Sequence, residues 1–219
     1  MRWLRRPARC LSESVVVSTP SANKAYNSIS EASVQVVELA VGSGAIMEWV
    51  PDVTIPFAGS RLRQAIHVKL GAGATIVLWD AIASGRIARG ERWKFESLEN
   101  EIWIRLESGA SLVERARLAP ASETGRIGLA EEWNYVASFY LIGDGVAEEM
   151  WKRIETNMVA LLDAELGPIL AGVSRPAAQG LCVKLLAKGA TDLSRAFDGL
   201  WSTARRELWN LPSPALRRY

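Results

Sequence analysis

The sequence predicts a mainly β fold: stacked antiparallel hairpins in a β-helix-like or sandwich-like body, with two appended amphipathic α-helices. The first observation is an apolar alternation with a period of two residues in three segments, each followed by a Gly-Ala pair. The second is an apolar stripe at three- and four-residue spacing in two later segments, which is the pattern of a half-buried helix. The third is composition, because 49% apolar and 23% charged residues in a chain of 219 suit one domain with a sizeable core.

Three short repeats support the strand prediction. In each repeat apolar residues alternate with other residues before a Gly-Ala pair, which begins at Gly44, Gly73 and Gly109. Alternation places every second side chain on one face, as in a half-buried strand. Glycine adopts the positive φ that a tight hairpin turn requires, so each repeat predicts a strand, a turn and a second strand. Three successive hairpins predict a body of stacked antiparallel strands.

The second half of the chain predicts two strands and two helices. In order, these are a strand over 133–142, a helix over 146–166, a strand over 180–187 and a helix over 191–208. The helical spacing is shown by residues such as Ile154 and Met158 in the first helix. Gly167 and Pro168 are expected to end that helix, and Thr191 is expected to cap the second.

The domain organisation is simple. Residues 12–219 are expected to form a single β-rich domain, because no long linker divides them. Residues 1–11 contain four arginines and are expected to be a disordered or mis-assigned tail.

Charge and cysteine content narrow the partners and the compartment. The formal net charge of +2 gives no strong field toward nucleic acid or anionic lipid, so neither is expected as a partner. No apolar run approaches the ~20 residues that a membrane-spanning helix needs. Cys10 and Cys182 form no CxxC motif, which fits free thiols in a reducing compartment, with Cys182 buried. A cytoplasmic protein without membrane association is therefore expected.

Side chains suited to catalysis or tight metal binding are few. His67 is the only histidine, and its place in an alternating strand predicts a packed or surface residue. One histidine and two distant cysteines cannot form a closed imidazole–thiolate metal site within one chain. The chain has no Walker A loop, Rossmann fingerprint or nucleophile elbow. We therefore expect neither an enzyme nor a permanent metal site; a hydrolase with Asp80 and Glu91 as acid and base is the catalytic alternative.

Three acidic residues occupy matching positions in the repeats. Glu48, Asp80 and Glu114 each stand two residues after an aliphatic side chain and so share its face of the strand. If those faces point inward, three carboxylates enter an apolar interior, where each needs a partner, water or a cation. One interpretation is a polar, water-lined conduit. The other is that the faces are solvated, or that nearby arginines, Arg86 first among them, neutralise the acids.

A glycine-flanked turn follows the second repeat. It runs from Gly85 to Glu91 and places Gly90 directly before the acid. Glycines at both ends permit a sharp turn, and an Arg86–Glu91 ion pair across it is expected.

Several segments, taken in order, are similar to the motifs of one protein family. Residues 19–28 resemble TP-x-A-x-K-x-Y-x-S, residues 47–51 resemble LEWLP, and residues 79–91 resemble WD followed by GR-x-x-x-GE, while 112–115 and the W-x-x-x-R of 201–205 also match. The motif positions are Lys24, Tyr26, Trp49, Pro51, Trp79, Gly85, Arg86, Gly90 and Glu91. On these residues the chain, from about residue 12 to its end, resembles the UreD (UreH) family of urease accessory proteins.

The resemblance implies a maturation role in place of catalysis. A UreD-like protein is expected to be a scaffold for nickel delivery into apo-urease, in complex with UreF and UreG. Nickel would then be in transit through an internal tunnel, with no permanently bound cofactor. The family's tunnel acids fall on Asp80 and Glu114, Asn23 matches a polar tunnel position, and Glu48 is a further candidate. A few oxygen ligands bind nickel more weakly than imidazole or thiolate would, which suits an ion that must be released.

The chain departs from the family pattern near its start. Family members carry an N-terminal extension with a Gly-Gly-Asp segment, and residues 1–11 stand in its place. Ala25 replaces an aromatic residue and Asn27 replaces an arginine. An incomplete N-terminal region would leave an exposed sheet edge. The alternative function is therefore a truncated or degenerate β-rich binding module that no longer acts on urease.

Overall fold

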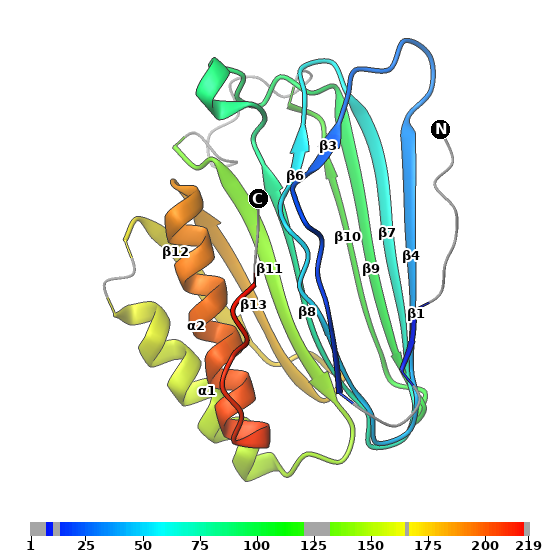
Figure 1. The fold of residues 1–219 in the computed structure, drawn as a ribbon, viewed down its shortest axis with the longest axis vertical. Coiled ribbons are helices and arrows are strands. Elements are labelled where there is room, and N and C mark those ends of the chain that lie inside the picture. Colours follow the sequence, from blue (N-terminus) through cyan, green and yellow to red (C-terminus); the bar gives the residue numbers. More distant parts are fainter. Residues whose placement is uncertain (1–7, 11–13, 121–131, 165–166, 217–219) are drawn as a thin grey trace.

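The fold has three layers, two β-sheets packed face to face and a pair of helices on the free face of one sheet (Figure 1). A computed structural model describes residues 8–10, 14–120, 132–164 and 167–216. The mainly β body with two helices confirms the predicted fold class. In the described part of the chain, neither helix is long and apolar enough to cross a membrane.

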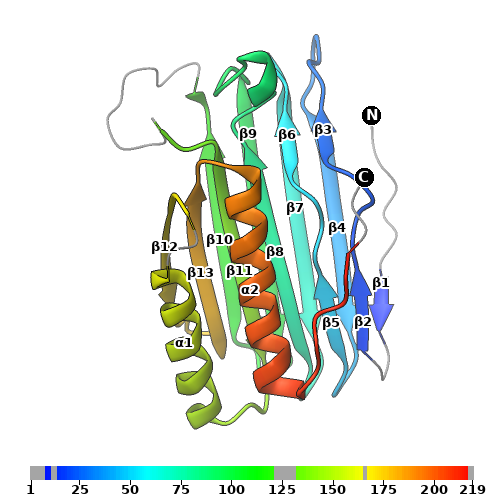
Figure 2. The ribbon, with the colours of Figure 1, turned by 60° about the vertical axis from the view of Figure 1, so that its left-hand side comes forward.

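The two sheets differ in size and position. The outer sheet contains, in spatial order, β1 (Ala8–Cys10), β4 (Ser33–Val41), β7 (Arg61–Leu70), β9 (Ser97–Leu106) and β10 (Ser111–Leu118). The central sheet contains, in spatial order, β12 (Ile169–Ser174), β13 (Gly180–Ala187), β11 (Tyr135–Gly143), β8 (Thr75–Ala83), β5 (Ile46–Trp49) and β2 (Ser14–Val17), with β3 (Asn23–Ala25) and β6 (Thr54–Pro56) beside it. The helices are α1 (Glu148–Asp163) and α2 (Ala190–Trp209), and a 3-10 turn, η1 (Ile87–Arg89), follows β8. Figure 2 shows both helices lying on the central sheet.

The first two predicted hairpins are wrong. After its glycine turn, β4 leads to β5 in the other sheet, and β7 leads to β8 in the same way. The resulting arches stack in parallel, β4 on β7 and β5 on β8. Their turns stack too, because Gly44 N donates to Ala72 O (2.8 Å) and Gly71 N donates to Val41 O (2.9 Å). Only the third repeat, β9 to β10 around Gly109, is an antiparallel hairpin.

The reason for this difference lies in β8. Every residue of β8 is buried, so both of its faces need cover. A hairpin partner of β7 would instead lie in the outer sheet, whose outward face is open to solvent. Alternation in a sequence predicts which face of a strand is buried, but it leaves the partner strand undefined.

The hydrophobic core has two parts, one on each face of the central sheet. Even-numbered residues of β8, such as Ile76 and Leu78, pack between the sheets. Odd-numbered residues, such as Trp79, pack under the helices. The Trp79 ring stacks on Phe197 with centroids 4.7 Å apart and meets Trp201 edge-on at 5.7 Å. These aromatic contacts fix α2 on the sheet.

The two helices confirm the prediction from the apolar periodicity. They cover 148–163 and 190–209, against predictions of 146–166 and 191–208. The predicted strands appear as β11 and β13, with β13 at the predicted bounds. The predicted cap is wrong: Gly189 is the N-cap of α2, without a side-chain hydrogen bond, and Thr191 lies inside the first turn. Asp192 also lies in that turn, where a carboxylate favours the positive helix terminus.

Part of the predicted tail is ordered structure. Ala8–Cys10 form β1 and pair in parallel with Leu39–Val41 of β4. The rest of the predicted tail lies outside the described residues.

Candidate functional site

Asp80 lies on β8 and points between the two sheets, where it is 6% exposed. Gln64 Nε2, from β7, donates to its Oδ1 at 2.9 Å, and Asn100 Nδ2, from β9, donates to its Oδ2 at 2.7 Å. Gln64 Nε2 also donates to Asn100 Oδ1 at 3.2 Å. Two amides of the outer sheet thus take the place of water around this carboxylate.

The surroundings of Asp80 change its acidity. Burial raises the pKa of this carboxyl, and the hydrogen bonds from Gln64 and Asn100 oppose that effect. Glu114 raises the pKa further and Lys184 lowers it. The pKa of Asp80 therefore depends on both Glu114 and the Lys184 ammonium.

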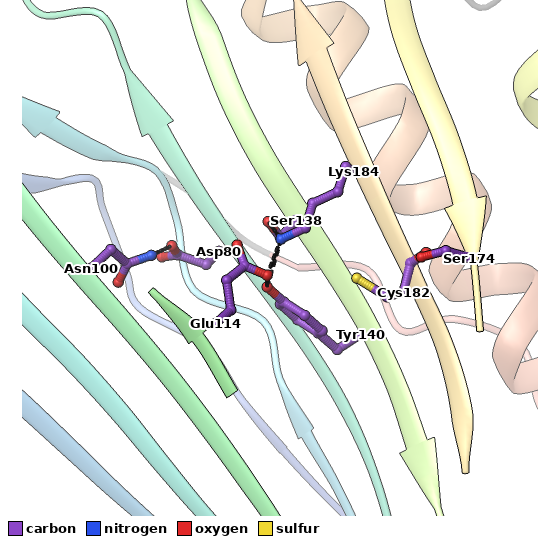
Figure 3. A network of polar contacts seen from close by, with 8 residues as sticks. All are labelled: Asp80, Asn100, Glu114, Ser138, Tyr140, Ser174, Cys182 and Lys184. Atoms are coloured by element: carbon purple, nitrogen blue, oxygen red, sulfur yellow. Dashed lines mark hydrogen bonds and ion pairs between the residues drawn. The ribbon is translucent and has the colours of Figure 1, made fainter. Parts of the chain in front are cut away.

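Glu114 lies on β10 at the border of the same space, with 29% of its side chain exposed. Tyr140 OH, from β11, donates a hydrogen bond to Glu114 Oε2. Lys184 Nζ, from β13, forms an ion pair with the same oxygen. Figure 3 shows Glu114 with Asp80 and Asn100 on one side of it and Ser138, Tyr140 and Lys184 on the other.

Strand register explains why these residues meet. Across the central sheet, Asp80 is paired with Ser138, and Ser138 is paired with Lys184. Residues paired across neighbouring strands project from the same face, so all three point toward the outer sheet. They form one polar row across β8, β11 and β13.

A second polar row crosses the outer sheet. Gln35 of β4 is in register with Gln64, and Gln64 is in register with Asn100. Asn23 Nδ2, from β3, donates to Gln35 Oε1 at 2.6 Å. The predicted polar residue Asn23 therefore stands at the end of the row that holds Asp80.

We call these facing rows, together with Glu114 and Tyr140, which contact Lys184, the polar layer. Its members are Asn23, Gln35, Gln64, Asp80, Asn100, Glu114, Ser138, Tyr140 and Lys184. The layer runs between two otherwise apolar sheet faces. Gln64 and Asn100 were not predicted, although each breaks an apolar alternation, between Leu62 and Ile66 and between Leu98 and Ile102.

Glu48 lies elsewhere, and its expected place beside the other two acids is wrong. In β5 it is in register with Val77, which faces the helices. Glu48 is fully buried there and accepts hydrogen bonds from Trp201 Nε1 and Arg205 Nη1 of α2. Arg205 Nε also donates to Pro212 O at 2.7 Å, which ties down the segment after the helix. The arginine that neutralises Glu48 is therefore Arg205. The W-x-x-x-R spacing places Trp201 and Arg205 on one face of α2, and this spacing could have predicted the contact.

The motif turn after β8 is built around the predicted Arg86–Glu91 ion pair, which the structure confirms. Arg86 Nε donates to Glu91 Oε2 at 2.7 Å, and the Arg86 guanidinium lies 4.3 Å from the centroid of the Phe57 ring. Arg86 lowers the pKa of the Glu91 carboxyl. Gly85 has φ +137°, and a Cβ there would stand 2.5 Å from Glu91 O, so the turn requires glycine.

This turn gives the catalytic alternative no support. Glu91 is bonded to Arg86 and to Ala58 N (3.4 Å), whereas Asp80 is bonded to Gln64 and Asn100. The two acids share none of these partners.

Other motif residues hold the fold. Trp79 Nε1 donates to Pro51 O at 2.6 Å, which joins two motif segments. Trp49 packs against the core between the sheets. Tyr26 meets the Phe57 ring edge-on at 4.8 Å and remains exposed, as does Lys24.

His67 lies outside the polar layer, on the free face of the outer sheet. Its Nε2 is 3.0 Å from Glu101 Oε1, and its ring meets Trp103 edge-on. This position confirms a surface residue. Within the residues that the structure describes, no three His, Cys, Asp or Glu side chains gather as a metal-binding group.

The comparisons with known proteins agree with one another. The family model described as UreD urease accessory protein matches residues 12–219. The urease accessory protein UreD of Herpetosiphon aurantiacus is 32% identical over 205 residues, which cover 90% of this chain and 71% of that protein. UreD of Haloarcula marismortui is 31% identical, with 93% and 67% covered, and UreD 2 of Streptomyces griseus subsp. griseus is 31% identical, with 98% and 73% covered. The chain therefore belongs to the UreD family of urease accessory proteins.

Proposed function

We propose that this protein is a non-enzymatic scaffold for nickel delivery into apo-urease and that nickel in transit passes along the polar layer. One observation carries the proposal most directly. Asp80 is a carboxylate buried between two apolar sheet faces, and it lies within electrostatic reach of a second acid, Glu114. Buried acids are costly unless a partner or a cation compensates them, so their presence favours a function over a purely structural role.

The ligand chemistry of the layer suits an ion that is passed on. Carboxylate, amide and hydroxyl oxygens hold nickel less tightly than imidazole or thiolate ligands do. Asp80 and Glu114 supply negative charge, and Asn23 supplies a neutral oxygen near the β3 end of the layer. We propose no permanent metal site.

The proposed partners are UreF, UreG and apo-urease. Family membership supports this proposal, because the related proteins are urease accessory proteins. We place the protein in the cytoplasm. The buried free thiol of Cys182 supports a reducing compartment.

The test compares two double variants in a strain that lacks its own UreD. The chain should co-purify with UreF and restore urease activity. Asp80→Ala with Glu114→Ala should lower the nickel content of urease and leave the UreF complex assembled, because these side chains lie between the sheets. Glu99→Ala with Glu107→Ala removes two acids outside the polar layer and is the matched control.

Two results would contradict the proposal. Normal nickel loading by the Asp80 and Glu114 double variant would make these acids structural. Failure of the unaltered chain to bind UreF and to restore urease would favour the alternative, a β-rich binding module that does not serve urease.

A further inference from the structure

Lys184 places a positive charge inside the polar layer. Its Nζ donates to Ser138 Oγ at 2.8 Å and to Tyr140 OH at 2.9 Å, and it forms an ion pair with Glu114 (Figure 3). An ammonium group has three N–H donors, and these contacts use all of them. Three oxygens from β10 and β11 thus converge on one cationic nitrogen.

We propose that Lys184 is a tethered cation that occupies the oxygens of Glu114 and Tyr140 until a divalent metal ion displaces it. The inference rests on the proposed function, because it assigns a gate to the same path. Lys184 would set how strongly the layer holds an ion, and so whether that ion can leave again.

The charges favour this assignment. Asp80 and Glu114 are two acids within electrostatic reach of each other, and the ammonium lowers the pKa of the more buried one, Asp80. Removal of Lys184 would leave two acids without this nearby positive charge. A divalent cation that arrived there would then meet no repulsion from the ammonium.

The geometry permits displacement. The Lys184 side chain is 47% exposed, and lysine has a long, flexible stem. On the neighbouring strand β12, Gly172 is in register with Lys184, and a Cβ built on Gly172 meets no atom within 4 Å. Open space therefore lies beside the lysine on its own side of the sheet. In its present position the ammonium also lies 5.1 Å from the centroid of the Tyr140 ring, which favours that position when no other cation is present.

A purely structural role explains less. A partly exposed ion pair contributes only ~0–1 kcal/mol to stability. The convergence of carboxylate, phenol and hydroxyl oxygens on one point resembles the hard oxygen ligand set of a cation site more than a surface pair.

The test is calorimetric titration of Ni²⁺ into the purified full chain. Lys184→Met keeps roughly the side-chain length and removes the charge. Lys184→Gln removes the charge and keeps N–H donors on a shorter side chain. Both should bind Ni²⁺ roughly tenfold more tightly than the unaltered chain, because a nearby like charge has been removed. Addition of Glu114→Gln should abolish the gain. Lys188→Met is the matched control, since Lys188 pairs with Glu132 outside the polar layer and is similarly exposed, and it should leave Ni²⁺ affinity unchanged.

The outcomes separate this inference from the proposed function. Unchanged or weaker Ni²⁺ binding in either folded Lys184 variant overturns the inference, while reduced urease loading by the Asp80 and Glu114 double variant would still support delivery. Tighter binding that Glu114→Gln abolishes supports the gate. If the Lys184 variants bind Ni²⁺ more tightly but the unaltered chain never restores urease activity, the role of Lys184 is supported and the proposed delivery of nickel to urease is wrong.

Discussion

At the scale of the residue, Asp80 shows how a buried acid can be retained without a direct ion pair to a cationic side chain. Its two oxygens accept from Gln64 and Asn100, and both donors are neutral amides. Neutral donors compensate less of the lost hydration than a guanidinium would. The pKa of Asp80 is accordingly raised, with desolvation as the largest cause.

The raised pKa gives the first prediction, for Asp80→Asn. Because the folded pKa of Asp80 lies above its unfolded value, its contribution to stability is present below the unfolded pKa and is lost as pH rises through the folded pKa. Asn has no carboxyl group to ionise, so the variant does not lose stability in this way. Its free energy of unfolding, relative to the unaltered chain, should therefore increase from about pH 4 to about pH 8.

Urea unfolding across that pH range measures the difference. Asp198→Asn, on the exposed side of α2, reports the general effect of removing one negative charge. If the free energy of unfolding of Asp80→Asn, relative to the unaltered chain, decreases as pH rises, the folded state stabilises the carboxylate and the prediction is wrong.

The acids also show how far single residues can be predicted. Strand alternation places each acid on the face of the aliphatic residue two positions before it, and it leaves open where that face points. For Asp80 and Glu114 the face lies toward the space between the sheets, whereas for Glu48 it lies toward the helices, because the register of β5 against β8 sets Glu48 beside Val77. Lys184 was not predicted, since its place depends on pairing between β11 and β13.

At the scale of the element, α2 is held to the sheet by a polar contact inside an apolar layer. Arg205 and Trp201 reach Glu48 from one turn of the helix, and Arg205 continues to Pro212. Loss of one partner from a buried ion pair leaves the other charge without compensation.

The second prediction concerns Arg205→Ala. It should lower the free energy of unfolding by ~3–5 kcal/mol, because the Glu48 carboxylate would remain buried without its cation. Arg206→Ala, at the next position of α2, removes a 63% exposed guanidinium and should change stability by no more than ~0.5 kcal/mol. Unfolding in guanidinium chloride measures the free energy of unfolding of both variants. Equal effects would mean that Glu48 does not depend on Arg205.

Elements were predictable to different degrees. Helix bounds could be read from apolar spacing because a helix makes its backbone hydrogen bonds within itself. Strand β12 was missed, because it follows Pro168 and contains Gly172, which are typical of a loop. The three repeats predicted strands and turns correctly, but two of the three turns join different sheets.

At the scale of the whole molecule, stacked arches determine the architecture. The parallel pairs β4–β7 and β5–β8 come from successive arches, so each turn must fit against the next. Gly71 stands at this contact. A Cβ on Gly71 would lie 2.7 Å from Ser43 N and 3.1 Å from Gly42 C, and these backbone atoms of the neighbouring turn leave little room for adjustment.

The third prediction compares two identical substitutions. Gly71→Ala should destabilise the fold by about 1–3 kcal/mol, because it forces the stacked turns apart. Gly172→Ala meets open space and should change the free energy of unfolding by no more than ~0.5 kcal/mol. Thermal and urea unfolding of both variants measures the contrast. If the two variants are equally stable, the arches do not stack as tightly as the turn contacts indicate.

The contact of Glu48 with Arg205 also has a consequence for biosynthesis. The two residues are 157 positions apart, and α2 is translated after every strand that the structure describes. At ~5–20 residues per second, the ribosome takes on the order of ten seconds or more to deliver the arginine. During that time Glu48 lacks the Arg205 guanidinium, and Trp79 lacks the rings of Phe197 and Trp201. We expect the nascent chain to expose the part of the sheet face that α2 covers until this helix emerges, and so to bind chaperones that recognise apolar surfaces during translation.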